Sequence, residues 1–503
     1  MKKIISLILQ YLVYELLLIT LRTLNLINSN LIKKKFRKLL AGIYIYIYRH
    51  TKAKRLPAMT VYMYLYDKDL FELEQFKKST ILFNSRIWKH FSKHNNHYLN
   101  KSALYQKEYS YISYYKFLDT CSVLDITDFC ADGDIQYLKK GAEITLSSPN
   151  VLNKGLCEKT YSIKEPDSYI ACLQDVIVHK NASILQKTND QWNWISYEPQ
   201  AHPKVKFVAN YWKQFIYYDN DKKQVLIPKI NRPSRTVKEA ILLNGRCSEN
   251  YFHWILESLS RVYILEKQSF FNLENTPLLI LDSMPITHYD TLKILAPDRP
   301  VIYYSEAENI AVEKLYVLSV PTLHYDDIDI PFLKGASVDF DYFRFVRNRV
   351  LNSKEYNIIS ELSYPKKIFV TRPKGAARSI KNQKAIEKYL VSKGFKIVYP
   401  ENMSFIEQAQ CFENADVIVG VNGAALTNLI FANQKAKVFI LINEYNEDFT
   451  WHYNLAKHVA GCDVFHITGK PVGSIRFKYP YEERMEKVKQ GYKIDMHDLK
   501  RFI

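Results

Sequence analysis

The amino-acid sequence predicts an α/β protein with two Rossmann-like halves facing a central cleft, together with a β-hairpin region and a helical N-terminal extension. The first observation is length, because 503 residues exceed what one hydrophobic core organises. The second is a run of alternating strands and helices from Ala240 onward, and the third is a repeat of that run after a predicted helix over residues 340–352. Such alternation is typical of parallel sheets built from βαβ units.

The composition is that of a folded chain with an anionic partner. Apolar residues make up 47% of the chain and charged residues 24%, both ordinary for a globular protein. The net charge of +18 indicates a nucleic acid, a lipid surface or a phosphorylated small molecule as partner, although no nucleic-acid-binding signature occurs. The seven cysteines form no CxxC pair, which favours a reducing compartment over a disulfide framework or a zinc site.

Residues 1–40 are predicted to form a membrane-surface anchor helix. Gln10 and Glu15 interrupt the apolar run near the N-terminus, which disfavours a helix that spans the bilayer. The following segment "LIKKKFRKLL" places cations among leucines, a composition typical of helices on anionic lipid. A helical hairpin packed on the domain is the alternative. Residues 41–155 are an N-terminal extension to which we assign no role.

The first half is predicted over residues 156–355. Up to about Ile230, short apolar runs are broken by polar turns, a pattern typical of hairpins. From Ala240 onward we expect strands over 240–245, 277–282, 301–305 and 314–320, and helices over 248–268 and 286–296.

The second half is predicted over residues 356–480, followed by a basic C-terminal tail over 481–503. Ser404 and Glu407 have the spacing of a capping box, and Gly394 is placed to end the preceding helix. We expect strands over 366–372, 395–400, 416–421 and 437–442, and helices over 381–394 and 404–415.

The first motif, "GRCSENYFHWILESLSRV" (245–262), lies at a predicted strand-to-helix junction. His253 and Glu257 are four residues apart, so the carboxylate can hold the imidazole in one tautomer, an arrangement that suits a general base. A lone structural histidine is the alternative. A projection at about 100° per residue predicts an apolar back and a polar front; the back holds Tyr251, Ile255, Leu259 and Val262, and the front Asn250, His253, Trp254, Glu257, Ser260 and Arg261.

The second motif, "VTRPKGAARSIKNQ" (370–383), follows a predicted strand. Four cations lie along its Gly-containing loop: Arg372, Lys374, Arg378 and Lys381. Guanidinium groups match phosphate oxygens two at a time, so this loop is suited to bind an anion. A solvated basic loop is the alternative.

The third motif, "DVIVGVNGAALTNLIFA" (416–432), ends a strand and starts a helix. Gly423, Ala424 and Ala425 lack bulk, which predicts that a ligand approaches the free N–H groups at the helix start. Neither the P-loop pattern nor the dinucleotide-binding pattern is present. Tight packing of the helix on the sheet is the alternative.

Together the three motifs resemble glycosyltransferase family 61, also known through its domain of unknown function 563. The similarity covers roughly Glu165 to Phe465 and is strongest after Ala240. It implies a GT-B architecture and an inverting, metal-independent reaction with no cofactor. A sugar from a nucleotide-sugar donor such as a UDP-sugar would pass to a hydroxyl of a glycan or glycolipid acceptor. Capsule and lipopolysaccharide enzymes of bacteria belong to this family, which implies a role in surface polysaccharide biosynthesis.

The resemblance also implies roles for individual residues. His253 with Glu257 would act as the catalytic base, and Arg246 and Asn250 would orient the acceptor. The donor-binding residues would be Arg372, Arg378, Asn382, Asn422, Gly423, Ala424, Ala425, Thr427 and Asn428. No metal-binding DxD follows a strand, and we expect the acidic stretch 326–329 to be solvated surface.

Three positions depart from the family pattern. Asn422 stands where the family has histidine, Gln383 where it has glutamate, and Ala425 where it has a second glycine. These changes motivate a second hypothesis, a non-catalytic nucleotide-sugar-binding or scaffold protein. A third, a lipid- or nucleic-acid-binding protein, rests on net charge alone.

We expect the protein at the cytoplasmic face of a bacterial inner membrane, bound to its anionic surface. A Golgi-type glycosyltransferase is the alternative, for which the sequons at Asn100, Asn181 and Asn402 would matter.

Overall fold

The computed structural model describes most of the chain after residue 117. The described ranges are 118–131, 133–180, 182–197, 217–219, 223–228, 230, 232–306, 308–324, 336–358, 364–372, 378–447, 449–473 and 490–503. The predicted anchor over 1–40, the acidic stretch 326–329 and Lys374 lie outside them. The chain forms two compact units, and each is described by itself.

The smaller unit holds an antiparallel arrangement of three strands. Strand β10 (Gln224–Pro228) pairs with β1 (Leu118–Asp125) on one side and with β9 (Tyr217–Asp219) on the other. The hairpin pattern predicted before Ile230 is therefore confirmed for β9 and β10.

The larger unit contains a first sheet with four parallel strands in the order β13-β12-β11-β14. Their bounds are β11 Arg235–Leu242, β12 Leu278–Leu281, β13 Val301–Tyr304 and β14 Asn309–Leu318. This confirms the first predicted set of parallel strands. On the other side of β14 the sheet continues with antiparallel strands, namely β6 (Ser168–His179), β7 (Ser183–Thr188) and β8 (Gln191–Ser196), while β2 (Ile135–Lys139) also pairs with β6.

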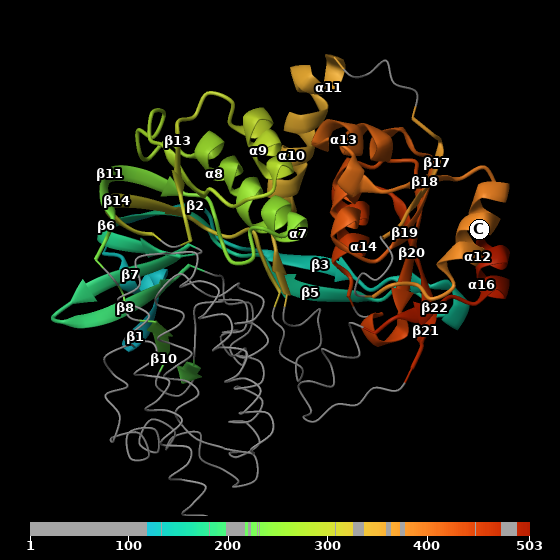
Figure 1. Ribbon diagram of the computed structural model, residues 1–503, viewed down its shortest axis with the longest axis horizontal. Coiled ribbons are helices and arrows are strands. Elements are labelled where there is room, and N and C mark those ends of the chain that lie inside the picture. The colour runs from blue at the N-terminus through green and yellow to red at the C-terminus, as the bar shows by residue number, and fades with distance from the viewer. Residues whose placement is uncertain are drawn as a thin grey trace, which may run out of the picture. The chain divides into compact units, whose positions relative to one another are not determined.

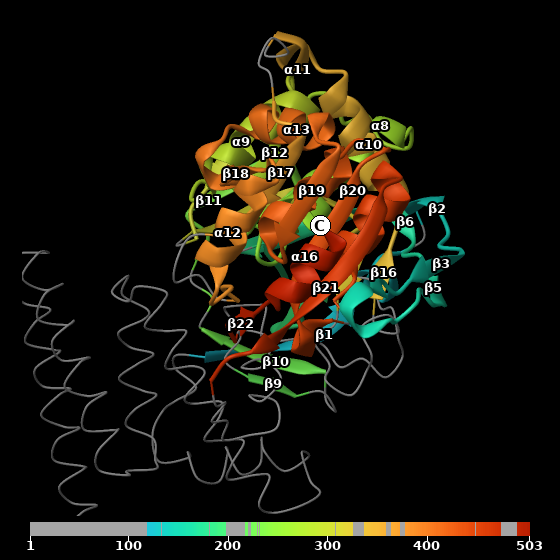
Figure 2. The ribbon, with the colours of Figure 1, turned by 90° about the vertical axis from the view of Figure 1, so that its right-hand side faces the viewer.

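A second sheet follows in the same unit, with five parallel strands in the order β18-β17-β19-β20-β21. Their bounds are β17 Lys367–Val370, β18 Lys396–Val398, β19 Val417–Val421, β20 Lys437–Asn443 and β21 Asp463–Pro471. Figure 2 shows these strands side by side. Four of them were predicted, and β21 was not. The central strands are buried on both faces, which explains their nearly continuous apolar sequences.

Helices cover both faces of this second sheet. Figure 1 shows α13 (Phe405–Asn414) and α14 (Trp451–Leu455) on one face, and α12 (Gln383–Ser392) and α16 (Met496–Phe502) on the other. Ser404 and Glu407 form the predicted capping box at the start of α13. Gly394 has a φ of +82° just after α12, a conformation that glycine adopts without strain, so its predicted role in ending this helix is confirmed.

The remaining helices of the larger unit belong mainly to its first half. They include α9 (Ile286–Leu295), α10 (Phe340–Leu351) and α11 (Lys354–Ile358). The helix predicted over 340–352 is thus confirmed as α10. A short helix, α6 (Ile126–Phe129), follows β1.

Part of the predicted extension packs on the second sheet. Strands β3 (Glu143–Ser147) and β5 (Thr160–Lys164) form a hairpin, and β4 (Asn150–Val151) between them pairs in parallel with β21. Asn454 exchanges two hydrogen bonds of 3.1 Å with the backbone of Ser147. Residues 143–155, to which the sequence assigned no role, therefore complete the second half.

The end of the chain differs from the expected basic tail. Strand β22 (Tyr492–Lys493) pairs antiparallel with β21, and α16 follows it. Tyr492, Ile494 and Leu499 are buried in the hydrophobic core of the second half. Burial of these three side chains therefore holds the segment on the second half, although its composition is basic.

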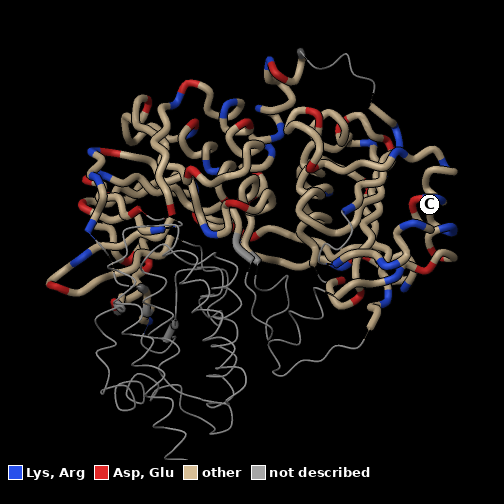
Figure 3. Tube along the Cα trace, viewed as in Figure 1, with Lys and Arg blue, Asp and Glu red and all other residues tan. Residues whose placement is uncertain are grey.

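Positive and negative residues are mixed along the described part of the chain. In Figure 3, Lys and Arg are interspersed with Asp and Glu along the trace. None of the helices in these ranges has the length and apolar content needed to cross a bilayer. All seven cysteines lie within the described ranges, and none of them forms a disulfide there.

Candidate active site

The helix predicted after β11 changes its period along its length. It comprises α7 (Tyr251–His253), a π-helical turn η5 (Trp254–Ser258), a 3₁₀ turn η6 (Leu259–Arg261) and α8 (Val262–Lys267). Asn250 caps it, because its side chain accepts a hydrogen bond of 3.0 Å from the N–H of Phe252. Irregular turns inside helices are frequent at functional sites, since they redirect side chains that a regular helix would place elsewhere.

The predicted polar front holds for Asn250 and His253, which are at least partly exposed, and is wrong for the rest of the helix. Trp254, Ser260 and Arg261 are fully buried. The indole of Trp254 donates a hydrogen bond of 2.8 Å to Thr291 and stacks on the ring of His288, both on α9. The helix is enclosed on nearly every side, so a simple projection that assumes one solvated face does not apply.

Glu257 lies between His253 and Arg246. His253 Nδ1 is 3.0 Å from Glu257 Oε1, and Arg246 Nε is 3.6 Å from Glu257 Oε2. The side chains of Glu257 and Arg246 are only 4% and 3% exposed, whereas that of His253 is 19% exposed. A carboxylate this close to Nδ1 favours the tautomer with the proton on that atom, which would make Nε2 the basic atom. The predicted contact is confirmed, while the catalytic role remains a prediction.

Gly423 accommodates a guanidinium group. A Cβ at this position would lie 3.2 Å from Cζ and Nη1 of Arg372, closer than ordinary van der Waals contact. Arg372 Nη1 also donates to the carbonyl oxygen of Asn422 over 3.4 Å. Burial lowers the pKa of Arg372, so an anionic partner would stabilise its charge. The missing side chain at Gly423 thus makes room for a cation that the second motif supplies.

Gly420 has a different reason to be glycine. A Cβ there would lie 2.4 Å from Cδ2 of Leu426, a residue of the helix η9 (Ala424–Phe431). The packing alternative is therefore correct for Gly420. Ala424 and Ala425 form the first turn of η9, a 3₁₀ helix in which the N–H of Leu426 bonds back to Gly423.

Asn422 forms a buried pair with a histidine that the sequence did not single out. His452 Nδ1 is 2.9 Å from Asn422 Oδ1, and both residues are 3% exposed. Burial lowers the pKa of His452 to about 3, with further contributions from Arg378, His466 and Arg372. Within the described ranges, Asn422 Nδ2 and His452 Nε2 are buried without a hydrogen-bond partner. The imidazole that Asn422 replaces is therefore present close by, from a different part of the chain.

The first and third motifs meet in space. The hydroxyl of Tyr251 donates a hydrogen bond of 2.6 Å to Asn428 Oδ1, whose Nδ2 donates to Gln408 over 2.8 Å. The ring of Phe252 packs edge-on against both His253 and His452, with centroid distances of 5.2 Å and 5.7 Å. The candidate base and the Asn422–His452 pair thus flank one phenyl ring.

This convergence agrees with the comparison to known families. Residues 251–439 match the family described as Glycosyltransferase 61. The glycosyltransferase 61 match begins in the first motif and ends in β20. It therefore includes His253, the second motif (370–383) and the third motif (416–432). Arg246, Asn250 and His452 lie outside the matched range. No curated protein matches the chain.

The other donor-binding residues that the glycosyltransferase 61 resemblance implies are placed as follows. Arg378 has a φ of +60° and is close enough to His452 to lower the pKa of that histidine. Thr427 is fully buried. Asn382, by contrast, both donates to and accepts from the backbone of Ile494, so its side chain holds the C-terminal segment.

Gln383 also has protein partners. Its Nε2 donates to Glu387 over 2.7 Å and to the carbonyl oxygen of Arg372 over 3.3 Å. The second of these bonds fixes the backbone that carries the arginine. The side chain of Gln383 thus holds the backbone of Arg372 in place. An ionised glutamate has no donor and could not form this hydrogen bond.

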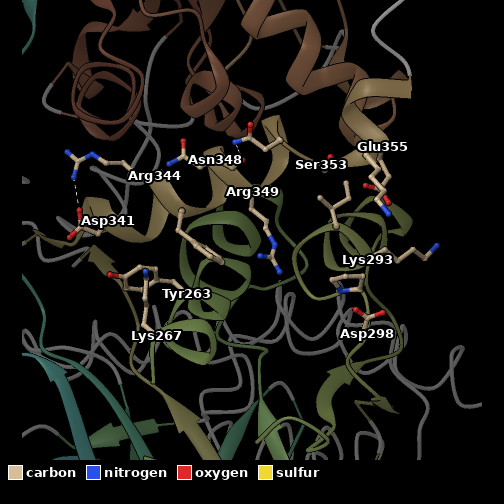
Figure 4. A pocket seen from close by; sticks show the side chains of 15 residues that line it. Tyr263, Lys267, Lys293, Asp298, Asp341, Arg344, Asn348, Arg349, Ser353 and Glu355 are labelled. Carbon is tan, nitrogen blue, oxygen red and sulfur yellow. Dashed lines mark hydrogen bonds and ion pairs between the residues drawn. The ribbon is translucent and has the colours of Figure 1, made fainter. Parts of the chain in front are cut away.

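An open groove of about 970 Å³ lies elsewhere in the larger unit. Figure 4 shows its lining side chains from α8, α10, α11 and the end of α9. Arg344 pairs with Asp341 at 2.8 Å and Arg349 with Glu266 at 3.3 Å, and these arginines are 47% and 40% exposed. No predicted site residue lines the groove. Both arginines are therefore paired and partly solvated, and the contacts around Gly423 are the better candidate for an active site.

The described ranges contain no cluster of three or more His, Cys, Asp or Glu that would hold a metal ion. The expectation of a metal-independent reaction stays a prediction.

Proposed function

We propose that the protein is an inverting glycosyltransferase of GT-B type that moves a sugar from a nucleotide-sugar donor, such as a UDP-sugar, to a hydroxyl of a glycan or glycolipid. The observation that carries the proposal is that Arg372 donates to the backbone of Asn422, the partner of His452, while His253 and His452 contact the same ring of Phe252. Ligands of such sheets bind at the carboxyl ends of the strands. The glycosyltransferase 61 match supports the transferase class.

The donor diphosphate binds at Arg372 and Arg378 in this proposal. Arg372 is the second residue after the carboxyl end of β17, and Gly423 lets its guanidinium lie against the backbone at the start of η9. Two positive charges can stabilise the negative charge that develops on the leaving diphosphate, an effect commonly worth several kcal/mol. The arginines would therefore stabilise the leaving diphosphate as a divalent cation does in other transferases.

His253 acts as the general base. With Nδ1 held by Glu257, Nε2 accepts the proton of the acceptor hydroxyl as its oxygen bonds to the anomeric carbon. The bond between that carbon and the diphosphate oxygen breaks with its electron pair, and the nucleoside diphosphate leaves. A single displacement of this kind inverts the anomeric configuration. Arg246 balances the buried charge of Glu257, which would otherwise be costly.

The cellular setting is proposed from the sequence. Residues 1–40 would bind the anionic cytoplasmic face of a bacterial inner membrane, where surface polysaccharides are assembled. Deletion of residues 1–40 should abolish co-sedimentation with vesicles that contain an anionic lipid. Unchanged sedimentation would argue against the anchor.

The activity is tested by incubation with a panel of UDP-sugars and acceptor glycans while UDP release is measured. We expect turnover of at least one UDP-sugar by the wild-type protein and its loss in His253→Ala. Equal UDP release by wild type and variant would contradict the role of His253.

A non-catalytic nucleotide-sugar-binding protein is the second candidate, favoured by Asn422 and Gln383 at positions where the family has titratable residues. Calorimetry with UDP separates the two. Binding without transfer supports the second candidate, whereas no binding contradicts both.

A further inference from the structure

The Asn422–His452 pair has one donor group and one acceptor atom to offer. Asn422 Oδ1 can only accept, so Nδ1 of the neutral His452 carries the proton and Nε2 is left with a lone pair. Asn422 Nδ2 carries N–H groups that, like Nε2, have no hydrogen-bond partner among the described residues. Burying such atoms without a partner is unfavourable. A group other than the described residues is therefore expected to bind them.

The surroundings limit what that group can be. Phe252 and Phe449 pack against the His452 ring at centroid distances of 5.7 Å and 5.5 Å, and Arg378, His466 and Arg372 are close enough to lower the pKa of this histidine. A phosphate or carboxylate ion accepts hydrogen bonds but has no proton to give Nε2, and its charge would face that lone pair. A hydroxyl group accepts from Nδ2 and donates to Nε2 at once. The pair is thus complementary to a neutral hydroxyl.

The position of the pair indicates which hydroxyl. On one side, Arg372 contacts the carbonyl oxygen of Asn422. On the other, His452 and His253 lie against the same ring of Phe252. If the diphosphate binds the arginine and the acceptor hydroxyl lies at His253, the transferred sugar must lie between them, next to Asn422 and His452.

We propose that Asn422 and His452 together bind one hydroxyl group of the transferred sugar and determine which sugar is accepted. The inference rests on the proposed function and extends it to specificity. His452 is part of the site although it is 30 positions beyond Asn422 and outside the range that matches the family.

The test compares a natural donor with its monodeoxy forms. A panel of UDP-glucose, UDP-N-acetylglucosamine and UDP-xylose first identifies the donor with the highest kcat/KM. Each monodeoxy form of that sugar is then assayed with wild type and with the double variant Asn422→Leu/His452→Phe. Replacing both members by apolar groups of similar size leaves no orphaned partner, which favours folding. UDP affinity is measured by calorimetry in parallel.

The matched control is His179→Phe. His179 is also buried and also pairs through Nδ1 with an asparagine, Asn309, at 2.6 Å, but it lies on β6 far from the strand ends of the second sheet. This variant should behave like wild type with every sugar.

We expect wild type to use one monodeoxy sugar about 10- to 100-fold less efficiently, the cost of leaving a buried pair unmatched. The double variant should discriminate less than about threefold, because it has no partner for that hydroxyl, and its UDP affinity should equal that of wild type. His452→Gln, whose amide offers both an acceptor and a donor, should retain part of the discrimination. If the double variant does not fold, the partial loss of discrimination expected for His452→Gln tests the same inference.

Three outcomes would overturn the inference. Equal discrimination by wild type and the double variant would mean that water alone binds the pair. A loss of UDP affinity as large as the loss in kcat/KM would mean that the pair only supports the arginines. In both cases the proposed function stands. No binding of UDP and no turnover of any UDP-sugar would overturn the proposed function and the inference with it.

Discussion

Two buried histidine–asparagine pairs occur in the larger unit, and their chemistry is nearly the same. In each, Nδ1 of the histidine lies within 3 Å of the amide oxygen, at 2.9 Å for His452 with Asn422 and 2.6 Å for His179 with Asn309. Burial is the main cause that lowers the pKa of each histidine to about 3. In the described part of the protein neither Nε2 has a hydrogen-bond partner. Judged by burial and pKa alone, the two pairs are equivalent.

Their positions differ. His179 and Asn309 face each other across the antiparallel strands β6 and β14, and their hydrogen bond joins two strands. Asn422 directly follows the carboxyl end of β19, and Arg372 and Arg378 both contribute to the lowered pKa of its partner His452. A perturbed pKa therefore does not identify a site by itself. The strand ends and the nearby cations distinguish the pair that we propose to bind the sugar from the pair that joins two strands.

The largest expected effect comes from His253, which is partly exposed and lies near the Asn422–His452 pair. His253→Ala should lower the transfer rate by about 10²- to 10⁴-fold, the usual contribution of a general base, with UDP affinity unchanged. His179→Ala serves as control and should retain the wild-type rate. A comparable loss in both variants would assign the effect of His253→Ala to disturbed packing rather than to loss of a general base.

Next in size is the arginine beside each pair. Arg372→Met should weaken UDP binding about 10- to 100-fold, since it removes charge-assisted hydrogen bonds. Arg235 is the matched residue near the other pair, where it donates to the carbonyl oxygen of Tyr303. Calorimetry should show unchanged UDP affinity for Arg235→Met. Equal losses would assign the effect of Arg372 to general electrostatics.

A smaller effect, the pH dependence of stability, should be common to both pairs. An unfolded histidine binds a proton near pH 6.5, whereas each folded histidine has a pKa of about 3. The unfolded state thus binds more protons between these values, so stability is full above pH 6.5 and falls as the pH decreases toward 3. The slope is at most about 1.4 kcal/mol per pH unit for each histidine.

Urea unfolding at pH 5 and pH 7.5 measures this slope. His179→Phe and His452→Phe should flatten it to the same extent, although only His452→Phe should change sugar discrimination. If either variant kept the wild-type dependence of stability on pH, the histidine at that position would not be the buried neutral group that causes it.

The smallest effect is expected at Gly423. Gly423→Ala adds a Cβ 3.2 Å from the Arg372 guanidinium, which must move by a few tenths of an ångström. UDP binding should weaken about two- to fivefold, a fraction of the cost of losing charge-assisted hydrogen bonds. The same change in the Arg372→Met background should have no effect on UDP affinity. An equal loss in both backgrounds would show that Gly423 acts independently of the arginine.

The sequence by itself determined the local features of the protein. Alternating apolar runs predicted the strands of both parallel sheets, and the spacing of Ser404 and Glu407 predicted a cap that the structure contains. The contact between His253 and Glu257 was also predictable, because residues four apart in a helix lie on the same side. These features depend on neighbours within a few positions in the chain.

Only the tertiary structure decided which distant residues share the site. Trp254 and Arg261 are buried because other elements enclose the helix. A projection of one helix carries no information about those elements. Arg372 fills the space left by Gly423, and His452 reaches Asn422 from a helix after the next strand. The order in which strands join a sheet brings these residues together, and that order follows from the packing of the whole unit rather than from any short segment of sequence.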